Sequence, residues 1–513
     1  MDEEDIPIIG EVLSISDDTV AGDLGPSTSA LVFPPGIRLP LSFTIMNSTS
    51  PYATSLVDGD GEEEEEDSGP DWSNLPDIAV ILIASFVHPW DRAKMGMTCH
   101  NWYRIVMSTP HLWRSTDMRF RGNYKDLDHV AYAKSVGRYL KKLYIYGGVR
   151  LGRRANRFQR TFTSMLQNLY RQGPVQLKEL TVTELHFNHQ FRGFNGNSAR
   201  KGVVRSLGRF IRMQLHLERL DLSYACFTCN EGLDLLRAAV NKSKSKLKYL
   251  YIEDMFQREQ NVGFCSEFAT VLSRCTSLVD ITLNYDCVSD DLLTKLAANC
   301  SKTLEYIHIR SHRCDSNQHA VDSSAWHGIR QAIPRLRVKF SLNGIMKIVD
   351  IQRLLVSTMP LQSVSIYGHN DDGFHPDRTV RHLARHYHDT LQKVIIDVGP
   401  VYRAYNRGLI ALITDCTALR FVEVHGRVGW LTLREIFEHI DEAFIKKNLT
   451  PSLSTLKVVI TSVPHEEPED EMLIMEEYRP LFESHNLNYE VVLDPIYPPL
   501  LLDNNPNLMA VFW

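Results

Sequence analysis

The sequence predicts a protein of the α/β class, in which a small helical module is followed by a curved solenoid with parallel strands inside and helices outside. Three observations support this prediction. A Leu-x-x-Φ-x-Φ pattern, where Φ is a large apolar residue, recurs between residues 140 and 458. Apolar residues at helical spacing fill the stretches between its copies. A dense apolar segment, residues 75–113, precedes the first copy and carries helix-start signals of its own.

The helical module is expected to begin at Pro76 and Asp77, because proline suits the first turn of a helix and an early carboxylate complements the helix dipole. Asp91 is predicted to cap a second helix. Apolar residues then recur at helical spacing, at Met95, Cys99, Trp102 and Val106. About forty residues bury too little apolar surface to be stable alone. We therefore expect the module to pack on the rest of this chain and on a partner.

This segment resembles an F-box, the module with which substrate receptors of ubiquitin ligases dock on the adaptor Skp1. The resemblance implies that the adaptor is bound by the residues at the signature positions, which are Leu75, Pro76, Ile83, Phe86, Val87, Asp91, Cys99, Trp102, Leu112 and Trp113. Arg92, Ala84 and Thr98 depart from the family, which usually has leucine, a large apolar residue and valine there. The interval from Trp102 to Trp113 is also one residue longer than in the family. The alternative interpretation is a helical cap for the repeats, with these tryptophans in its core.

The strand pattern has ten clear copies, which start 25 to 40 residues apart when one degenerate copy is included. The clear copies are Leu140-Leu143-Ile145, Leu177-Leu180-Val182, Leu217-Leu220-Leu222, Leu247-Leu250-Ile252, Leu278-Ile281-Leu283, Leu304-Ile307-Ile309, Leu361-Val364-Ile366, Leu391-Val394-Ile396, Leu419-Val422-Val424 and Leu453-Leu456-Val458. The degenerate copy is Leu336-Val338-Phe340. Each interval has room for one strand and one helix, so the repeats resemble leucine-rich repeats. Ala225 and Asp286 stand where the ribonuclease-inhibitor type of repeat prefers Asn or Cys.

Composition divides the chain into four parts. We expect a disordered acidic tail at 1–70, the F-box at 71–120, the solenoid at 121–490 and a capping tail at 491–513. Residues 1–74 contain 17 acidic residues and one basic residue, whereas residues 75–513 contain 45 acidic and 55 basic residues. A segment of this kind either stays solvated or folds back on the basic body. The C-terminal segment either caps the last repeat or contributes apolar residues to the substrate site, namely Leu500–Leu502, Phe512 and Trp513.

Several function classes find no support in the sequence. No apolar run is long enough to span a membrane, and no basic-then-apolar leader is present, so the expected location is the cytoplasm, the nucleus or both. Nine cysteines without a framework spacing fit a reducing compartment. The clusters that could serve a metal are loose: Cys226 with Cys229, His382 with His386 and His388, and His312 with Cys314 and His319. We expect no metal, no cofactor and no catalysis by this chain.

A basic run marks the first repeats. Its members are Arg150, Arg153, Arg154, Arg157, Arg160, Arg200, Lys201, Arg205, Arg209 and Arg212. These residues either form solvated helix faces or select an acidic or phosphorylated substrate, because arginine forks match phosphate oxygens. The aromatic interleaving typical of single-strand binding is absent, so nucleic acid is not an expected partner.

The two resemblances together imply a non-catalytic substrate receptor of an Skp1–cullin–F-box ubiquitin ligase. The F-box would bind an Skp1-type adaptor, and through it a cullin-RING ligase, while the strands would bind an unknown substrate protein. Side chains that project from the strands are the candidates for substrate contact: Tyr144, Tyr146, Thr181, Thr183, Asp221, Tyr251, Glu253, His308 and Arg310. The alternative is a leucine-rich-repeat scaffold that binds partners without recruiting a ligase.

Overall fold

The computed structural model describes residues 72–494, with internal gaps. The gaps are 148–153, 172–174, 188–193, 244–245, 259, 261, 314, 316–318, 346, 369–373, 399–404, 406, 427, 429, 448–452, 462–475, 481–482 and 484–486. The predicted acidic tail lies outside the described residues, and so does the C-terminal segment from 495 onward.

The helical module consists of three α-helices flanked by two short 3-10 helices. They are η1 (Trp72–Asn74), α1 (Asp77–Phe86), α2 (Pro89–Gly96), α3 (His100–Ser108) and η2 (Pro110–Trp113). As predicted, α1 begins directly after Pro76, with Asp77 in its first turn. The predicted cap of α2 is wrong. His88 is the N-cap, and its Nδ1 accepts a hydrogen bond from the Trp90 amide, while Asp91 lies in the first turn. Proline at the first helical position fixes the start of α2 three residues earlier than expected.

Thirteen parallel strands of the described chain form one sheet in sequence order. They are β1 (Ser115–Arg119), β2 (Lys142–Tyr146), β3 (Glu179–Thr183), β4 (Arg219–Asp221), β5 (Tyr249–Tyr251), β6 (Asp280–Asn284), β7 (Tyr306–His312), β8 (Arg337–Asn343), β9 (Leu361–Gly368), β10 (Lys393–Val398), β11 (Phe421–Gly426), β12 (Thr455–Thr461) and β13 (Asn488–Asp494). All ten clear copies of the pattern and the degenerate copy form strands, which confirms the prediction of parallel repeats. The pattern did not predict β1, which extends the sheet at its N-terminal edge.

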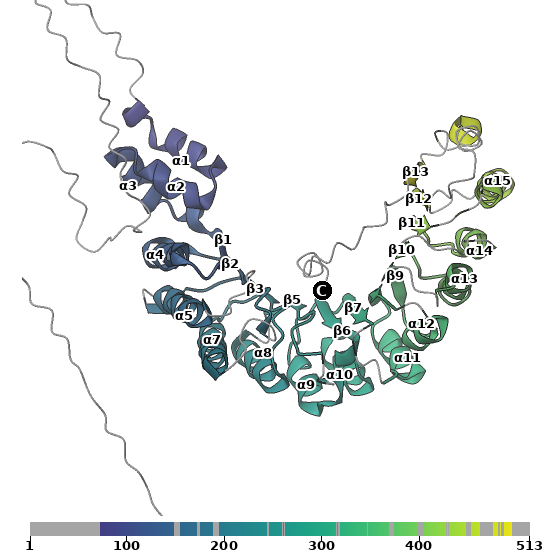
Figure 1. The fold of residues 1–513 in the computed structure, drawn as a ribbon, viewed down its shortest axis with the longest axis horizontal. Coiled ribbons are helices and arrows are strands. Elements are labelled where there is room, and N and C mark those ends of the chain that lie inside the picture. The colour runs from purple at the N-terminus through teal and green to yellow at the C-terminus, as the bar shows by residue number, and fades with distance from the viewer. Residues whose placement is uncertain are drawn as a thin grey trace, which may run out of the picture. The chain divides into compact units, whose positions relative to one another are not determined.

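The connecting helices lie on the outer side of the curved sheet, as Figure 1 shows. The α-helices are α4 (Leu127–Val136), α5 (Ala155–Arg171), α7 (Phe194–Arg212), α8 (Cys229–Ser243), α9 (Ser266–Leu272), α10 (Asp290–Cys300), α11 (Ser323–Ala332), α12 (Ile348–Leu354), α13 (Pro376–Tyr387), α14 (Arg407–Asp415) and α15 (Trp430–Lys447). Short 3-10 helices are η3 (Tyr124–Asp126), η4 (Gly137–Tyr139), η6 (Val262–Phe264) and η7 (Tyr285–Cys287). Within the part of the chain that the structure covers, no helix has the length and apolar character needed to cross a membrane.

The core lies between the sheet and the helices. The apolar positions of the repeat pattern point into it, and alternate residues of each strand are buried and partly exposed, as in β6. Neighbouring strands hold equivalent residues in register, so that Leu220 pairs with Leu250, and Leu250 with Ile281. Ala225 and Asp286 are also buried. Because each repeat buries its apolar side chains against the next repeat, the stack is expected to unfold cooperatively.

The helical module shares this core with the first repeat. The indole nitrogen of Trp90 donates a hydrogen bond to the Asp117 carbonyl at 3.0 Å, and the Trp90 ring lies 4.7 Å from the Tyr132 ring. Trp113 is fully buried, and its ring packs edge-on against Tyr132 at 5.8 Å. The module is therefore built onto the sheet through β1 and α4, in agreement with the expectation that it packs on the rest of the chain.

Candidate functional sites: an exposed helical face and the concave face of the sheet

Helix α1 presents an apolar face to solvent. Ile78, Leu82 and Phe86 are 80%, 58% and 83% exposed, and their spacing of four residues places them in one row along the helix. Val80 and Ala84, on the opposite side, are fully buried. Large apolar side chains that are exposed in a continuous row are typical of a surface that binds another protein.

The signature residues of the F-box fall into three groups. Pro76, Ile83, Phe86 and Asp91 are exposed; Leu75, Val87, Cys99 and Trp102 are partly buried; Leu112 and Trp113 are buried. Only the first two groups have surface that an adaptor could touch, and their role as contacts stays a prediction. Leu112 and Trp113 lie in the chain's own core, so they support the module from within. The sequence interpretation did not single out Ile78 and Leu82, although their helical spacing with Phe86 was visible in the sequence.

Two partly buried members of the signature hold the helices in place. The Cys99 sulfur caps α3 by accepting a hydrogen bond from the Trp102 amide at 3.5 Å. The indole nitrogen of Trp102 donates to the Trp72 carbonyl at 2.9 Å. The first bond caps α3, and the second attaches η1 to it.

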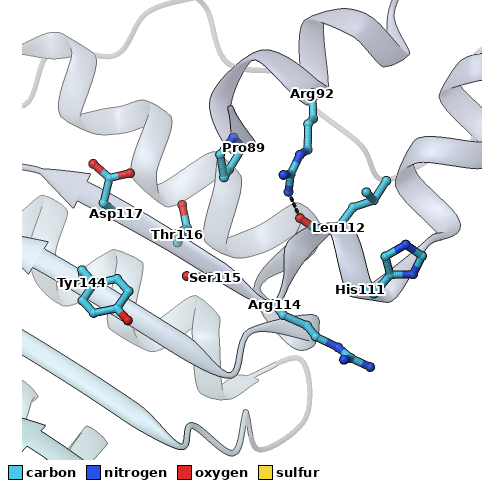
Figure 2. Close-up of a pocket in the computed structure, with 9 residues that line it drawn as sticks. All are labelled: Pro89, Arg92, His111, Leu112, Arg114, Ser115, Thr116, Asp117 and Tyr144. Atoms are coloured by element: carbon cyan, nitrogen blue, oxygen red, sulfur yellow. Dashed lines mark hydrogen bonds between the residues drawn. The ribbon is translucent and has the colours of Figure 1, made fainter. Parts of the chain in front are cut away.

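Arg92, one of the departures from the family pattern, caps the C-terminal end of helix α1 from its position on α2. Its Nε donates to the carbonyls of Ala84 and Val87, each at 2.8 Å, and its Nη1 donates to the Leu112 carbonyl in η2. The last carbonyls of a helix lack partners within the helix, so a guanidinium there both satisfies them and complements the dipole. Figure 2 shows this side chain in a pocket formed with η2, β1 and β2. Arginine therefore stands at this position as a helix cap.

Replacement of Arg92 by the family's usual leucine is expected to destabilise the module by about 2 kcal/mol, because partly buried carbonyls lose charged donors. The loss should be concentrated at the end of α1. Hydrogen exchange of the amides in residues 80–87 measures this effect. The control is Lys94→Leu, since Lys94 is exposed and forms an ion pair with the exposed Asp91 at 2.6 Å. Equal protection in the two variants would contradict the assigned role.

The predicted substrate contacts lie on strands β2 to β7 or directly after them. Tyr144, Tyr146, Asp221, Tyr251, Glu253, His308 and Arg310 are partly buried, and Thr181 and Thr183 are buried. Several already have partners in the chain. Tyr144 donates to Glu179 at 3.0 Å. Arg310 contacts Glu253, and its Nη1 also donates to the Tyr224 hydroxyl at 2.9 Å. Arg310 thus links β7 to the ends of β4 and β5. Substrate contact by these nine residues stays a prediction.

A second group on the concave face was missed by the sequence interpretation. Lys339 lies 5.0 Å and Arg337 6.0 Å from the centre of the Tyr306 ring, and Lys393 lies 4.5 Å from that of Phe421. None of the three cations forms an ion pair within 4 Å with any residue that the structure describes. We call these five residues the concave cationic patch. Two of its cations lie on β8, the degenerate copy, where the alternation of charged with apolar residues was the available signal.

Asp280 and His308 form a partly buried pair next to this patch. The His308 Nε2 lies 3.5 Å from an Asp280 carboxylate oxygen. Burial raises the pKa of Asp280 to about 6, although Lys339 and Arg219 oppose the shift. Burial, assisted by Lys339, lowers the pKa of His308 to about 4. Near neutral pH the pair therefore holds a desolvated carboxylate beside an uncharged imidazole.

Asp280→Asn is expected to stabilise the protein at neutral pH by about 1 kcal/mol. The folded pKa of Asp280 lies above its ordinary value of 3.8, so its contribution to stability is complete below that value and is lost as the pH rises through about 6. The amide avoids this loss. Denaturant midpoints at about pH 4 and pH 7.5 measure the effect, which should be present only at the higher pH. A difference that is independent of pH would show that the substitution acts through packing.

The histidine and cysteine clusters lie on repeat elements. His382 and His386 lie on α13 with ring centres 4.6 Å apart, while His388 pairs with Asp389 at 3.2 Å. Burial raises the pKa of the Cys226 thiol to about 11, the opposite of the shift that activates a cysteine. Among the residues that the structure describes, no group of three or more His, Cys, Asp or Glu side chains is arranged to hold a metal ion. Cys314 lies outside the described residues.

The described members of the basic run lie on the helical side of the sheet. Arg154 to Arg160 lead into or belong to α5, and Arg200 to Arg212 belong to α7. Because these helices cover the outer side (Figure 1), the run does not contribute to the concave face. Arg150 and Arg153 lie outside the described residues.

Comparison with known proteins identifies one part of the chain by family. Residues 72–119 match the F-box-like family model. Among solved structures, the chain is similar to one titled "Crystal structure of TLR13-ssRNA13 complex", with 12% sequence identity and a TM-score of 0.31. That match covers 70% of this chain and 42% of the other, so the chain spans less than half the length of that protein. The chain joins an F-box-like domain to a curved sheet of parallel strands with helices on its outer side.

Proposed function

We propose that this chain is the substrate-recognition subunit of an SCF ubiquitin ligase, with the α1 face binding an Skp1-type adaptor and the concave face binding a substrate protein. One observation carries the proposal: the row of Ile78, Leu82 and Phe86 is exposed on the helix of an F-box-like domain. Leaving three large apolar side chains in water is unfavourable by roughly 1.5–3 kcal/mol each relative to burial, so this face favours a bound partner.

The mechanism requires no bond chemistry from this chain. A substrate held on the repeats and a cullin-RING ligase held through the adaptor share one assembly, so that the ubiquitin-charged partner meets substrate lysines at a high effective concentration. The chain therefore acts as a non-catalytic receptor in the cytoplasm or the nucleus.

The concave cationic patch supports a substrate that presents an acidic or phosphorylated segment. Arg337, Lys339 and Lys393 have no carboxylate partners among the described residues, and their aromatic neighbours Tyr306 and Phe421 supply apolar surface beside them. Guanidinium and ammonium groups bind carboxylates and phosphates through charge-assisted hydrogen bonds. An acidic or phosphorylated substrate was one alternative for the basic run, and we propose the concave side as its site instead.

A substrate trap tests this proposal. Deleting the F-box is unsuitable, because Trp90 and Trp113 share a core with the first repeat. The exposed pair Leu82→Asp and Phe86→Asp instead removes adaptor binding while the repeats stay folded. Proteins that this variant captures and stabilises in cells should be lost when Arg337, Lys339 and Lys393 are also changed to alanine. If the proteins are still captured after the triple change, the patch is not the substrate site. If they are stabilised equally with and without the two Asp substitutions, the scaffold alternative is favoured.

A further inference from the structure

The first repeats contain a large excess of basic over acidic residues. Residues 129–217 contain 17 basic residues and two acidic ones, Glu179 and Glu184, in a protein whose formal net charge is −6. Helices α5 and α7 contain no acidic residue at all. A potential of this size attracts polyanions, because the field of many like charges adds at the surface.

The structure places eight of these basic residues on the outer side, on or beside two neighbouring helices. Helices α5 and α7 lie side by side on the convex side (Figure 1), and the Thr163 and Ser206 hydroxyls are 3.0 Å apart across their contact. Eight exposed basic residues, which we call the convex basic face, belong to the two helices or precede α5 directly: Arg154, Arg157, Arg160, Arg171, Lys201, Arg205, Arg209 and Arg212. None of them forms an ion pair within 4 Å with the described part of the chain.

Neighbouring acidic residues are already neutralised. Arg200, on the buried side of α7, binds Glu231 of α8 at 2.5 Å, and Arg237 pairs with Asp234 at 2.5 Å. Among the residues that the structure describes, the convex basic face therefore has no acidic partner that would need to be displaced. The line from Lys201 to Arg212 spans eleven residues, or about 17 Å of helix, and α5 adds a parallel line about 10 Å away.

The side chains between the charges indicate the kind of partner. They are polar and short, and include Asn156, Gln159, Ser198 and Ser206. None of the exposed large apolar residues lies on α5 or α7. The central contacts of most protein interfaces, and of amphipathic helices on membranes, are apolar or aromatic side chains. Arginine, lysine, serine and asparagine are the side chains that contact the phosphates and sugars of nucleic acids.

We propose that the convex basic face binds the sugar–phosphate backbone of double-stranded nucleic acid without base-sequence preference. Single strands bind by stacking their bases on aromatic side chains, so the lack of aromatic residues on this face argues against a single-stranded ligand. It does not argue against a duplex, because the bases of a duplex are already stacked on one another. This surface lies on the helical side, opposite the concave face, so the inference does not depend on the proposed ligase function.

Fluorescence anisotropy of the full chain with labelled DNA and RNA duplexes of about 24 base pairs, between about 50 and 200 mM salt, tests the proposal. The triple variant Arg205→Gln, Arg209→Gln, Arg212→Gln should weaken binding about 100-fold at physiological salt, since each lost phosphate contact costs roughly fivefold there. Its plot of log affinity against log salt should be shallower by about 2.7. A preference for one of the two duplexes shows whether the face binds DNA or RNA.

The matched control is Arg330→Gln, Arg378→Gln, Arg385→Gln, which removes the same charge from exposed positions on α11 and α13. It should bind the duplex within about twofold of the unchanged chain, because its charges lie outside the face. Equal losses in the two triple variants would overturn the proposal. So would absence of duplex binding, or tighter binding to phosphatidylserine vesicles or poly-glutamate than to the duplex.

Discussion

Leu283→Asp is expected to unfold the central repeats. Leu283 is 1% exposed on β6 and lies in register with Ile309 on β7, inside the core that all repeats share. The substitution removes a buried apolar side chain, worth about 2–5 kcal/mol with its cavity, and adds a carboxylate that has no partner there. These losses together approach the total stability of a typical domain, about 5–15 kcal/mol.

Thermal unfolding and limited proteolysis measure this effect. The control is Thr282→Asp on the same strand, because Thr282 points to the concave side and is only partly buried. That variant should unfold within a few degrees of the unchanged protein. An unchanged unfolding temperature for Leu283→Asp, together with loss of a binding partner, would mean that Leu283 is a contact residue and not part of the core.

The double variant Leu82→Ala, Phe86→Ala is expected to weaken adaptor binding by at least 100-fold, while thermal unfolding stays unchanged. Both side chains are more than half exposed, so truncation removes little from the chain's own core. Central apolar anchors of an interface typically contribute about 2 kcal/mol or more each. Isothermal titration calorimetry with a purified Skp1-type adaptor measures the affinity.

Val349→Ala with Leu431→Ala is the matched control, since these exposed apolar residues lie on α12 and α15 of the repeats. The control should bind the adaptor as the unchanged chain does. Equal affinity of both double variants would show that the row on α1 is not the docking surface.

Most of the fold could be predicted from the sequence because it repeats. In each strand of the pattern, apolar residues alternate with polar ones. This alternation made β8 recognisable although its leucine, Leu336, lies one residue closer to the strand than the motif requires. Strand β1 was missed because its inward residues, Thr116 and Met118, do not carry the leucine pattern. This strand is held in place by its pairing with β2 and by the hydrogen bond from Trp90 to Asp117, which are both contacts between segments distant in the sequence.

The functional surfaces were less predictable, because they depend on which face of an element is left uncovered. The sequence located α1 but did not show that Ile78 and Leu82 stay in water while Leu112 and Trp113 are buried. It also located the basic run without showing that α5 and α7 turn it toward the convex side. From the sequence, Arg92 was only a departure from the F-box pattern. Its role as a cap could not be predicted, because its carbonyl partners come from α1 and η2 and are brought together only by folding.

The most direct measurement is titration of the folded full-length chain with the Skp1-type adaptor. The proposed function predicts a stable complex of one chain with one adaptor, abolished by the change of Leu82 and Phe86 and insensitive to the change of Arg337, Lys339 and Lys393. A well-folded sample that shows no affinity for the adaptor would contradict the assignment to a ubiquitin ligase and leave only a repeat protein that binds other partners.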